Sequence, residues 1–268
     1  MSTPIRLAVY GAAGRMGKRV IALASADKTF EVISAIDHAE NPLTGQDAGV
    51  SAGVASLDVP ITSQWPSSAD AAIDFSLPAA ADACIAACLD ARIPLVMATT
   101  GLSAVQKEAL AEAAQTIPIV WAPSMSTAVN LTMKVVQQMT ETLKNVAGGV
   151  DIEILERHHR FKADAPSGTA LRFGELIAEK MDGDVQHVHG RHGETGQRSR
   201  NEIGYHAIRV GDNPGEHSIV FGLLGERIEI NVAASNRDCY ASGALAAAKY
   251  LQGKDAGLYN MFDVLGLS

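Results

Sequence analysis

The first half of the chain alternates short apolar runs with stretches of helical periodicity. The runs, each of strand length, are residues 5–10, 30–36, 71–75, 94–98 and 117–121. The helical stretches are residues 15–26, 78–91 and 103–115, the last opening with Ser103 and Gln106 at capping-box spacing. Strands that alternate with helices of this length form a parallel sheet covered on both faces. The pattern therefore predicts a Rossmann-like, doubly wound α/β domain.

A different pattern begins after about residue 122. A long helix is predicted over 126–146, an alternating strand over 151–156 and a second helix over 169–181. Three strand-like segments follow, at 203–211, 217–223 and 227–234. An Ala-rich helix at 238–251 could pack back on the first domain. We therefore expect one α/β domain of residues 1–126 and 237–268, and a smaller α+β domain of residues 127–236.

Charge and composition exclude several classes of protein. The formal net charge of −8 argues against nucleic acid as the main partner. The apolar runs are too short and too interrupted to span a bilayer, so no membrane partner is expected. The N-terminal residues do not resemble a signal peptide, and three cysteines are too few for a disulfide framework. A reducing, cytoplasmic location is expected.

A glycine-rich loop follows the first apolar run. Gly11, Gly14 and Gly17 have the spacing G-x-x-G-x-x-G and lie between the first strand and the first helix. Glycine lets the backbone approach a pyrophosphate, and the helix N-terminus favours its negative charge. Such a loop can also join a strand to a helix for steric reasons alone. Its position in a strand–loop–helix–strand unit favours dinucleotide binding.

Asp37 ends the second strand, where a carboxylate can hold the ribose hydroxyls of a dinucleotide. A 2′-phosphate would meet this negative charge, so NADH is favoured over NADPH. The side chains of His38 and Arg15 could offset part of that repulsion. We therefore expect NADH or NADPH as the cofactor, with NADH preferred.

Basic residues cluster in the segment 157–162, which reads Arg-His-His-Arg-Phe-Lys, and residues 163–169 follow it and open a helix. Cations next to a helix N-terminus make a receptor for a small carboxylate, with the amides of Gly168 and Thr169 as further donors. The alternative is a solvated basic turn in which Ser167 or Thr169 caps the helix. A metal site is disfavoured, because His158 and the residue after it point different ways on an extended chain and Lys162 would repel the ion.

The segment 187–192 carries three more histidines, at a loose ligand spacing. Its neighbours are basic, so we interpret it as a solvated loop and expect no metal. The cysteines Cys84 and Cys88 lie one turn apart on an Ala-rich helix and are interpreted as small core residues.

Several segments together resemble the dihydrodipicolinate (4-hydroxy-tetrahydrodipicolinate) reductase family over nearly the whole chain. They are residues 11–17, 98–101, 122–126, 153–169 and 209–217. The most specific is 153–169, which ends in Asp-Ala-Pro-Ser-Gly-Thr. The resemblance implies reduction of a cyclic unsaturated dicarboxylate, with loss of water, to tetrahydrodipicolinate in the diaminopimelate route of lysine biosynthesis. It also implies a dinucleotide-binding domain of residues 1–126 and 237–268 and a substrate-binding and oligomerisation domain of residues 127–236. A homotetramer built through the second sheet is implied as well, for which strands 217–223 and 227–234 are apolar enough.

The resemblance also assigns roles to individual residues. His158 matches the proton donor/acceptor and Lys162 the proton donor. The positions that match substrate-carboxylate contacts are His159, Gly168 and Thr169. Those that match cofactor contacts are Gly11, Ala12, Ala13, Gly14, Arg15, Met16, Asp37, Ala98, Thr99, Thr100, Ala122, Pro123, Ser124 and Met125.

Two other functions stay open at this point. The first is a different two-domain NAD(P)-dependent dehydrogenase, acting for example on aspartate semialdehyde or homoserine. The second is a dinucleotide sensor without turnover. The combination of His158, His159 and Lys162 with Pro-Ser-Gly-Thr argues against both.

Overall fold

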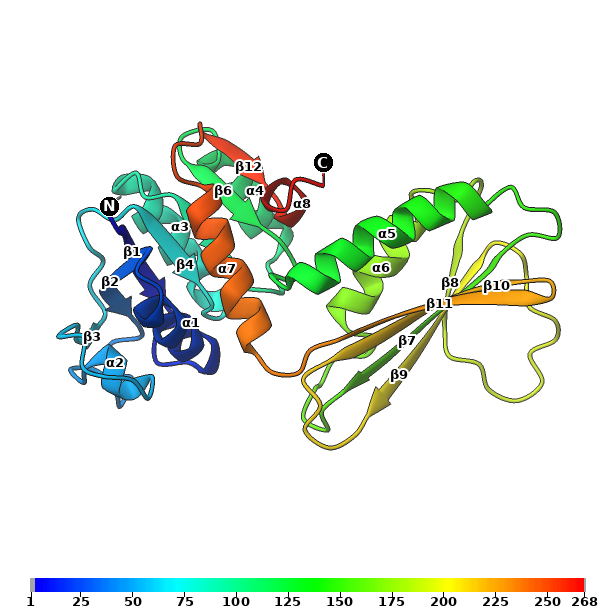
Figure 1. Cartoon of the computed structure of the whole chain (residues 1–268), viewed down its shortest axis with the longest axis horizontal. Helices are drawn as coiled ribbons and strands as arrows, with labels where there is room; N and C mark the ends of the chain where they lie inside the picture. The colour runs from blue at the N-terminus through cyan, green and yellow to red at the C-terminus, as the bar shows by residue number, and fades with distance from the viewer. Residues whose placement is uncertain (1–2, 268) are drawn as a thin grey trace. The chain divides into compact units, whose positions relative to one another are not determined.

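The computed structural model describes residues 3–267. The chain divides into two compact units (Figure 1). The first extends to Thr127 and resumes at Arg237, and the second comprises Ala128–Asn236. The first unit is thus built from two separate stretches of sequence, and the chain enters and leaves the second unit by two connections.

The first unit contains a seven-stranded sheet in which every neighbouring pair of strands is parallel. In spatial order its strands are β12 (Gly257–Tyr259), β6 (Pro118–Trp121), β5 (Leu95–Met97), β4 (Ala71–Asp74), β1 (Ile5–Tyr10), β2 (Phe30–Ile36) and β3 (Ile61–Thr62). The strand order reverses between β1 and β4, which is the usual place of a ligand site in such sheets. The predicted Rossmann-like sheet is confirmed.

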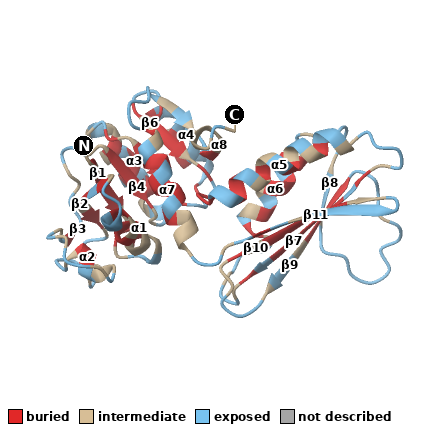
Figure 2. Cartoon of the chain, in the orientation of Figure 1, coloured by how far each residue is buried: buried red, intermediate tan, exposed pale blue. Residues whose placement is uncertain are grey.

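Helices cover both faces of this sheet, as Figure 2 shows by the buried residues between the layers. They are α1 (Arg15–Ala26), α2 (Ala48–Ser51), the 3₁₀ turn η1 (Pro78–Ala80), α3 (Ala81–Asp90), α4 (Ala104–Ala113), α7 (Asp238–Tyr250) and α8 (Met261–Val264). Successive residues of β1 enter different cores, since Leu7 packs in the cluster that includes α1 and α7, and Ala8 in the cluster with α3 and α4. The capping box at Ser103 is present, and its side chain accepts from the Gln106 amide.

The second unit contains a five-stranded mixed sheet. In spatial order its strands are β11 (Glu226–Ala233), β10 (Glu216–Leu223), β7 (Asp151–His158), β9 (Glu202–Arg209) and β8 (Gln186–His189). The pairs β11–β10 and β10–β7 are antiparallel, and β7–β9 and β9–β8 are parallel. Two helices, α5 (Thr127–Leu143) and α6 (Gly168–Ala178), lie on one side of this sheet in Figure 1. The outcome is the α+β arrangement predicted for this part of the chain.

Two expectations about the second sheet need correction. The segment 187–192 is not wholly a loop, because residues up to His189 form the edge strand β8. The rings of His187 and His189 stack on Tyr205, and the His187 Nδ1 atom lies 2.7 Å from the Tyr205 hydroxyl. This aromatic packing, which the polar sequence of β8 does not reveal, holds the strand on the sheet. Among residues 3–267, no group of three or more His, Cys, Asp or Glu is placed to hold a metal ion.

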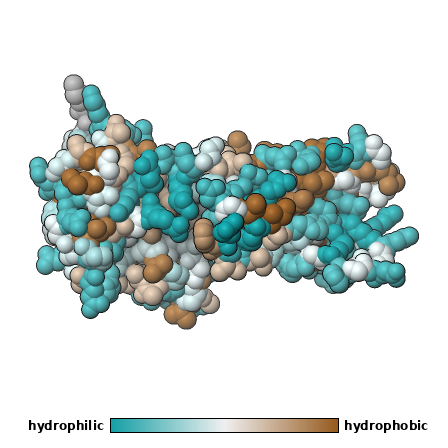
Figure 3. Space-filling model, turned by 90° about the horizontal axis from the view of Figure 1, so that it is seen from below, coloured by the Kyte–Doolittle hydropathy of each residue, from teal (hydrophilic) through white to brown (hydrophobic). Residues whose placement is uncertain are grey.

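The second correction concerns the apolar residues of β10. Ile219 and Phe221 are fully buried within the unit, so they are not available to an interface. The opposite face carries Val220, whose register partners are Glu153 and Glu229. On the side of the chain shown in Figure 3, hydrophilic residues predominate and apolar ones form small patches. None of the helices within residues 3–267 has the length and apolar character that crossing a membrane requires.

Candidate active site

The glycine loop between β1 and α1 is closely packed. Gly11 has a φ of +75°, and a Cβ atom there would lie 2.8 Å from the Phe75 carbonyl oxygen. A Cβ atom at Gly17 would lie 2.2 Å from the Gly11 oxygen. The amides of Gly11 and Ala12 both donate to the Ile36 carbonyl, at 2.9 and 3.0 Å. Only glycine fits at these two positions, so the start of α1 is held against the loop and its first amides lie at the end of β1, as binding of a dinucleotide pyrophosphate requires.

Asp37 lies directly after β2, beside this loop. Its Oδ2 atom accepts from the Ala13 amide at 2.9 Å, and its Oδ1 atom accepts from the Asn41 side-chain amide at 2.9 Å. The glycine loop therefore orients the Asp37 carboxylate, and both are predicted to bind the same dinucleotide. Asn41 was not identified from the sequence, because an asparagine four residues after the acid carries no motif of its own.

The other predicted cofactor residues follow β5 and β6. Because β1, β4, β5 and β6 are adjacent and parallel, their carboxyl ends meet at one edge of the sheet. There the buried residues are Ala98, Thr99, Ala122, Ser124 and Met125. The exposed ones are Arg15, Thr100 and Pro123, with Met16 half-buried. The sheet order thus places the segments that carry the predicted cofactor residues at one edge of the sheet.

Helix α7 fixes the last of these segments in place. A Cβ atom at Gly243 would lie 1.7 Å from the Met125 carbonyl oxygen. The sequence analysis did not identify Gly243, because its neighbour is more than a hundred residues away in the chain. The glycine allows the Ala-rich helix to lie directly on the 122–126 segment.

Asp74 was given no role on sequence grounds, yet it ends β4 between the glycine loop and the 98–101 segment. The side chain is fully buried, and its Oδ1 atom accepts from the Ser76 amide at 2.7 Å. Burial raises the pKa of Asp74, and the hydrogen bonds from Ser76 oppose this shift only in part. Asp74 lies near the predicted cofactor segments because β4 stands between β1 and β5 in the sheet. This order cannot be predicted from the sequence of β4 alone.

In the second unit, a buried carboxylate organises the basic cluster. Glu156 on β7 is 1% exposed, and its Oε2 atom lies 2.5 Å from His158 Nδ1. The guanidinium of Arg209, on the neighbouring strand β9, donates to both carboxylate oxygens, at 2.7 and 2.8 Å. The Ser167 amide donates to Oε1 at 3.0 Å. Four hydrogen bonds therefore converge on one side chain.

These hydrogen bonds decide the charge of Glu156. Burial alone would raise the pKa of this carboxyl group, but the bonds from His158, Arg209 and Ser167 lower it to about 2. Glu156 is therefore ionised at neutral pH. Neither Glu156 nor Arg209 was assigned a role from the sequence, although both lie in segments that carried the family resemblance.

His217 on β10 completes the buried part of the cluster. It is 5% exposed, its Nε2 atom lies 3.1 Å from Ser167 Oγ, and its ring centroid is 5.2 Å from that of His158. Burial and the charges of His158 and Lys162 lower the pKa of His217 to about 4, against the opposing effect of Glu156. His217 is therefore neutral at neutral pH.

This low pKa predicts a pH dependence of stability. The unfolded chain takes up the His217 proton near pH 6.5, but the folded chain does so only near pH 4. The contribution of His217 to the free energy of unfolding should therefore be complete above pH 6.5. The free energy should fall by up to about 3 kcal/mol as the pH drops to 4. Urea unfolding followed by circular dichroism at several pH values measures this. In His217→Gln the same interval should show a smaller slope, and an equal slope in both proteins would contradict the assignment.

Lys162 and the start of α6 lie on the segment after β7. The Lys162 Nζ atom is 2.8 Å from Asp164 Oδ1, and despite partial burial this ion pair holds the pKa of Asp164 below its usual range.

Ser167 is the N-cap of α6 and accepts from the Ala170 amide, so the capping alternative is correct for this residue. Gly168 and Thr169 begin the helix, where their amides can donate to a bound carboxylate. His159 is half-buried, and its amide donates to the Asn213 carbonyl at 2.8 Å.

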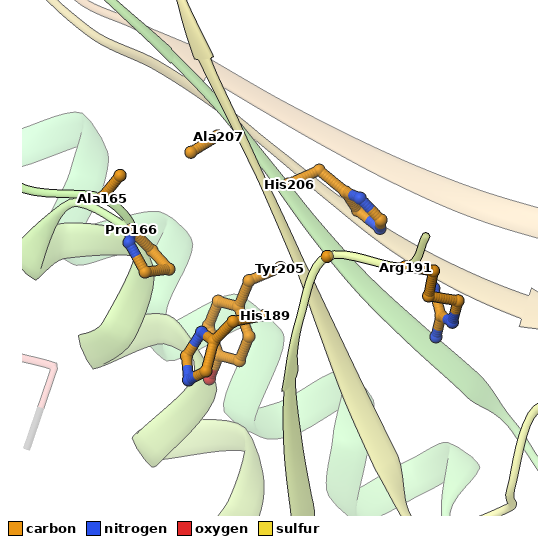
Figure 4. Close-up of a pocket in the computed structure, with 8 residues that line it drawn as sticks. Ala165, Pro166, His189, Arg191, Tyr205, His206 and Ala207 are labelled. Atoms are coloured by element: carbon orange, nitrogen blue, oxygen red, sulfur yellow. The ribbon is translucent and has the colours of Figure 1, made fainter. Parts of the chain in front are cut away.

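A hollow of about 340 Å³ lies near this segment, beside β9 (Figure 4). Its lining residues are Ala165, Pro166, His189, Gly190, Arg191, Tyr205, His206 and Ala207. It shares Ala165 and Pro166 with the segment that carries the resemblance, but neither His158 nor Lys162 lines it. The predicted catalytic side chains therefore lie outside the lining of this hollow, with His158 hydrogen-bonded to Glu156 and Lys162 paired with Asp164.

Comparisons with known proteins agree with this arrangement. The family models described as dihydrodipicolinate reductase, N-terminus and C-terminus, match residues 5–125 and 128–265. The chain belongs to the dihydrodipicolinate reductase family. It is 65% identical to the 4-hydroxy-tetrahydrodipicolinate reductase of Rhodopirellula baltica, over 99% of this chain and 97% of the relative. It is 45% identical to the enzyme of that name from Pseudomonas fluorescens, over 98% and 99%.

Solved structures show the same fold. Dipicolinate-bound dihydrodipicolinate reductase from Paenisporosarcina sp. TG-14 superposes with a TM-score of 0.76 at 24% identity, over 97% of this chain and 98% of that one. An amine dehydrogenase from Mycobacterium smegmatis superposes with a TM-score of 0.62 at 11% identity, over 96% and 95%. The two-unit plan is thus shared with members of the dihydrodipicolinate reductase family and with a dehydrogenase of different name.

Proposed function

We propose that the chain catalyses the NAD(P)H-dependent reduction of 4-hydroxy-tetrahydrodipicolinate, with loss of water, to tetrahydrodipicolinate. This is a step of the diaminopimelate route of lysine biosynthesis. One observation carries the proposal for this member of the family: the buried Glu156 carboxylate joins His158 to the N-terminus of α6, and the connecting segment carries Lys162. The arrangement supports both functions that the reaction needs from the protein, holding carboxylates and moving protons.

The first unit would hold the dinucleotide. The glycine loop, in which a Cβ at Gly11 or Gly17 would collide with the backbone, fits a closely approaching pyrophosphate. Asp37 would hold the adenine-side ribose, and the segments after β5 and β6 would line the nicotinamide half. When bound, the reduced nicotinamide supplies the hydride, and this chemistry belongs to the cofactor.

The second unit would hold the dicarboxylate. The amides of Gly168 and Thr169, at the positive end of α6, favour one carboxylate through direct donors and the helix dipole. His159 is the third proposed contact. Asp164 next to Lys162 balances the positive charge locally when no substrate is present.

Two side chains are proposed to handle the proton. Hydride addition leaves negative charge on the conjugated ring-nitrogen system, and this charge must be neutralised by a proton. We assign that proton to Lys162, and we assign to His158 the task of positioning or relaying it. His217, neutral at neutral pH, adds no further positive charge beside them.

A steady-state assay tests the proposal. The product of dihydrodipicolinate synthase is supplied with NADH or NADPH, and the fall in nicotinamide absorbance is followed. We expect turnover with both cofactors and a lower KM for NADH, because Asp37 repels a 2′-phosphate. Turnover only with aspartate semialdehyde or homoserine would favour the other dehydrogenase, and tight NADH binding without any turnover would favour the sensor. A strong preference for NADPH would contradict the assignment of Asp37.

We also propose a homotetramer assembled through the second sheet. The proposal rests on the family resemblance and on the face of that sheet opposite α6, on which Glu153 and His206 lie 2.7 Å apart (His206 Nε2 to Glu153 Oε2). This face carries the apolar residues Leu155, Val220 and Ile208 among its charged ones, so both apolar contacts and ion pairs are available to such an interface. Sedimentation equilibrium measures the assembly, and a monomer at micromolar concentration would contradict it.

The cytoplasm is the proposed location. No disulfide joins Cys84, Cys88 or Cys239 in the described part of the chain, and the first two are buried. Cysteines without disulfides are typical of proteins in a reducing compartment. Cell fractionation followed by the reductase assay tests the location, and activity confined to a non-cytoplasmic fraction would contradict it.

A further inference from the structure

We propose that Glu156 is a positioning residue that fixes the tautomer of His158 and holds the first turn of α6 in register with it. The proposal rests on the proposed function for its catalytic consequence. It goes beyond that function because it assigns the orientation of the proton-carrying side chain to a residue outside the predicted site. The hydrogen-bond geometry around the carboxylate carries it.

Every backbone and guanidinium neighbour of the Glu156 carboxylate is a donor. Oε1 accepts from the Ser167 amide and from Arg209, and Oε2 accepts from Arg209. None of these groups can accept a hydrogen bond in return. The His158 Nδ1 atom, 2.5 Å from Oε2, is the only one of the four neighbouring atoms that can be either a donor or an acceptor. Because the carboxylate is ionised, it can only accept, so Nδ1 must carry hydrogen.

Because Nδ1 of His158 must carry hydrogen, only the Nε2 atom of this ring can take up and release a proton. The groups that face the ring are Glu156 on its own strand, Arg209 at the register position of β9 and His217 on β10. When His158 relays a proton, the Nε2–H bond breaks and its electron pair stays on Nε2. The neutral ring that remains carries hydrogen on Nδ1, which is the tautomer that Glu156 accepts from. Glu156 itself stays ionised throughout, because Arg209 holds both of its oxygens.

The same carboxylate links the proton relay to the carboxylate receptor. Through Oε1 it holds the Ser167 amide, and Ser167 is the N-cap of α6. Gly168 and Thr169, the proposed substrate contacts, are the next two residues. One side chain therefore fixes the spacing between the proton carrier and the helix N-terminus.

The substitution Glu156→Gln separates positioning from a merely structural role. An amide has one accepting and one donating end, so the NH₂ group must face either Ser167 or His158, and at either end it also loses one hydrogen bond from Arg209. The Ser167 amide cannot accept, but His158 Nδ1 can accept if its hydrogen moves to Nε2. We therefore expect the tautomer of His158 to invert while the contact to Ser167 persists. Accordingly, kcat should fall about 10- to 100-fold, the usual effect of losing such an orienting partner, with KM for the dicarboxylate nearly unchanged.

The measurement is ¹⁵N NMR of the imidazole rings at a pH where His158 is neutral. The chain has eight histidines, and the spectrum of His158→Gln identifies the signal. In the unsubstituted protein we expect hydrogen on Nδ1 and none on Nε2. Hydrogen on Nε2 in that protein would overturn the proposal, and this measurement does not depend on the folding of any variant.

Glu153→Gln is the matched control. Glu153 lies on the same strand but on the opposite face, accepts from His206, Arg191 and Arg198, and has a pKa that these bonds lower to about 2 against the effect of burial. This substitution should leave the His158 tautomer and kcat unchanged. Equal loss of kcat in both variants, with the tautomer unchanged, would show that β7 carboxylates act only through stability and would overturn the proposal. If the tautomer inverts in Glu156→Gln but the unsubstituted protein has no reductase activity, the role of Glu156 stands and only the proposed function is refuted.

Discussion

Lys162→Ala is expected to lower kcat by about two to four orders of magnitude, the usual contribution of a general acid. The ring that receives the hydride must be protonated, and alanine has no proton to give. Folding should be little affected, because the lysine pairs only with Asp164, whose side chain is 59% exposed. The dissociation constant of NADH, measured by fluorescence titration, should be unchanged. The measurement that decides is kcat under saturating substrate and cofactor.

Lys144→Ala provides the control for this substitution. Lys144 also belongs to the second unit and also pairs with acidic side chains, Glu141 and Asp182, at 3.2 and 3.4 Å. It follows α5 and is not part of the proposed site. Its removal should leave kcat within about twofold, because its acidic partners are exposed and such pairs contribute little. Near-normal kcat in Lys162→Ala would refute the assignment of the proton to this side chain.

Gly17→Ala is expected to weaken dinucleotide binding by about 10- to 100-fold. The new Cβ atom would lie 2.2 Å from the Gly11 oxygen and 2.7 Å from the Ala12 Cα atom, both of which belong to the backbone. Helix α1 must then move away from the glycine loop, since no side-chain rotation can relieve the collision. Overpacking of this kind costs about 1–3 kcal/mol or more, and 1.4 kcal/mol is tenfold in affinity. Titration with NADH, alongside thermal unfolding, measures both consequences.

Gly14→Ala gives a graded comparison in the same loop. A Cβ atom at Gly14 would lie 3.0 Å from the Gly11 oxygen, so a shift of a few tenths of an ångström accommodates it. We therefore expect a smaller loss of affinity than for Gly17→Ala. The steric argument fails if the two variants bind NADH equally, or if Gly17→Ala binds it as tightly as the unsubstituted protein.

Features that depend on neighbours in the chain could be predicted from the sequence. The Rossmann-like sheet follows from local apolar periodicity, and the glycine loop and Asp37 lie within one βαβ unit. The segment from His158 to Thr169 is likewise continuous, so its basic charge and its helix start are visible without a structure. The edge strands β8 and β12 were not predicted from the sequence. They are short and largely exposed, so they lack the apolar alternation that identifies longer strands.

What the sequence by itself determined is the type of fold and the position of each motif along the chain. Only the tertiary structure placed Arg209 and His217 beside Glu156, since strands β9 and β10 bring them from 53 and 61 residues away in the chain. The physical reason is that hydrogen bonds between strands join residues without regard to their separation in the chain. The charge of Glu156, the neutrality of His217 and the tautomer of His158 are all set by these long-range neighbours, so they could not be read from the order of residues.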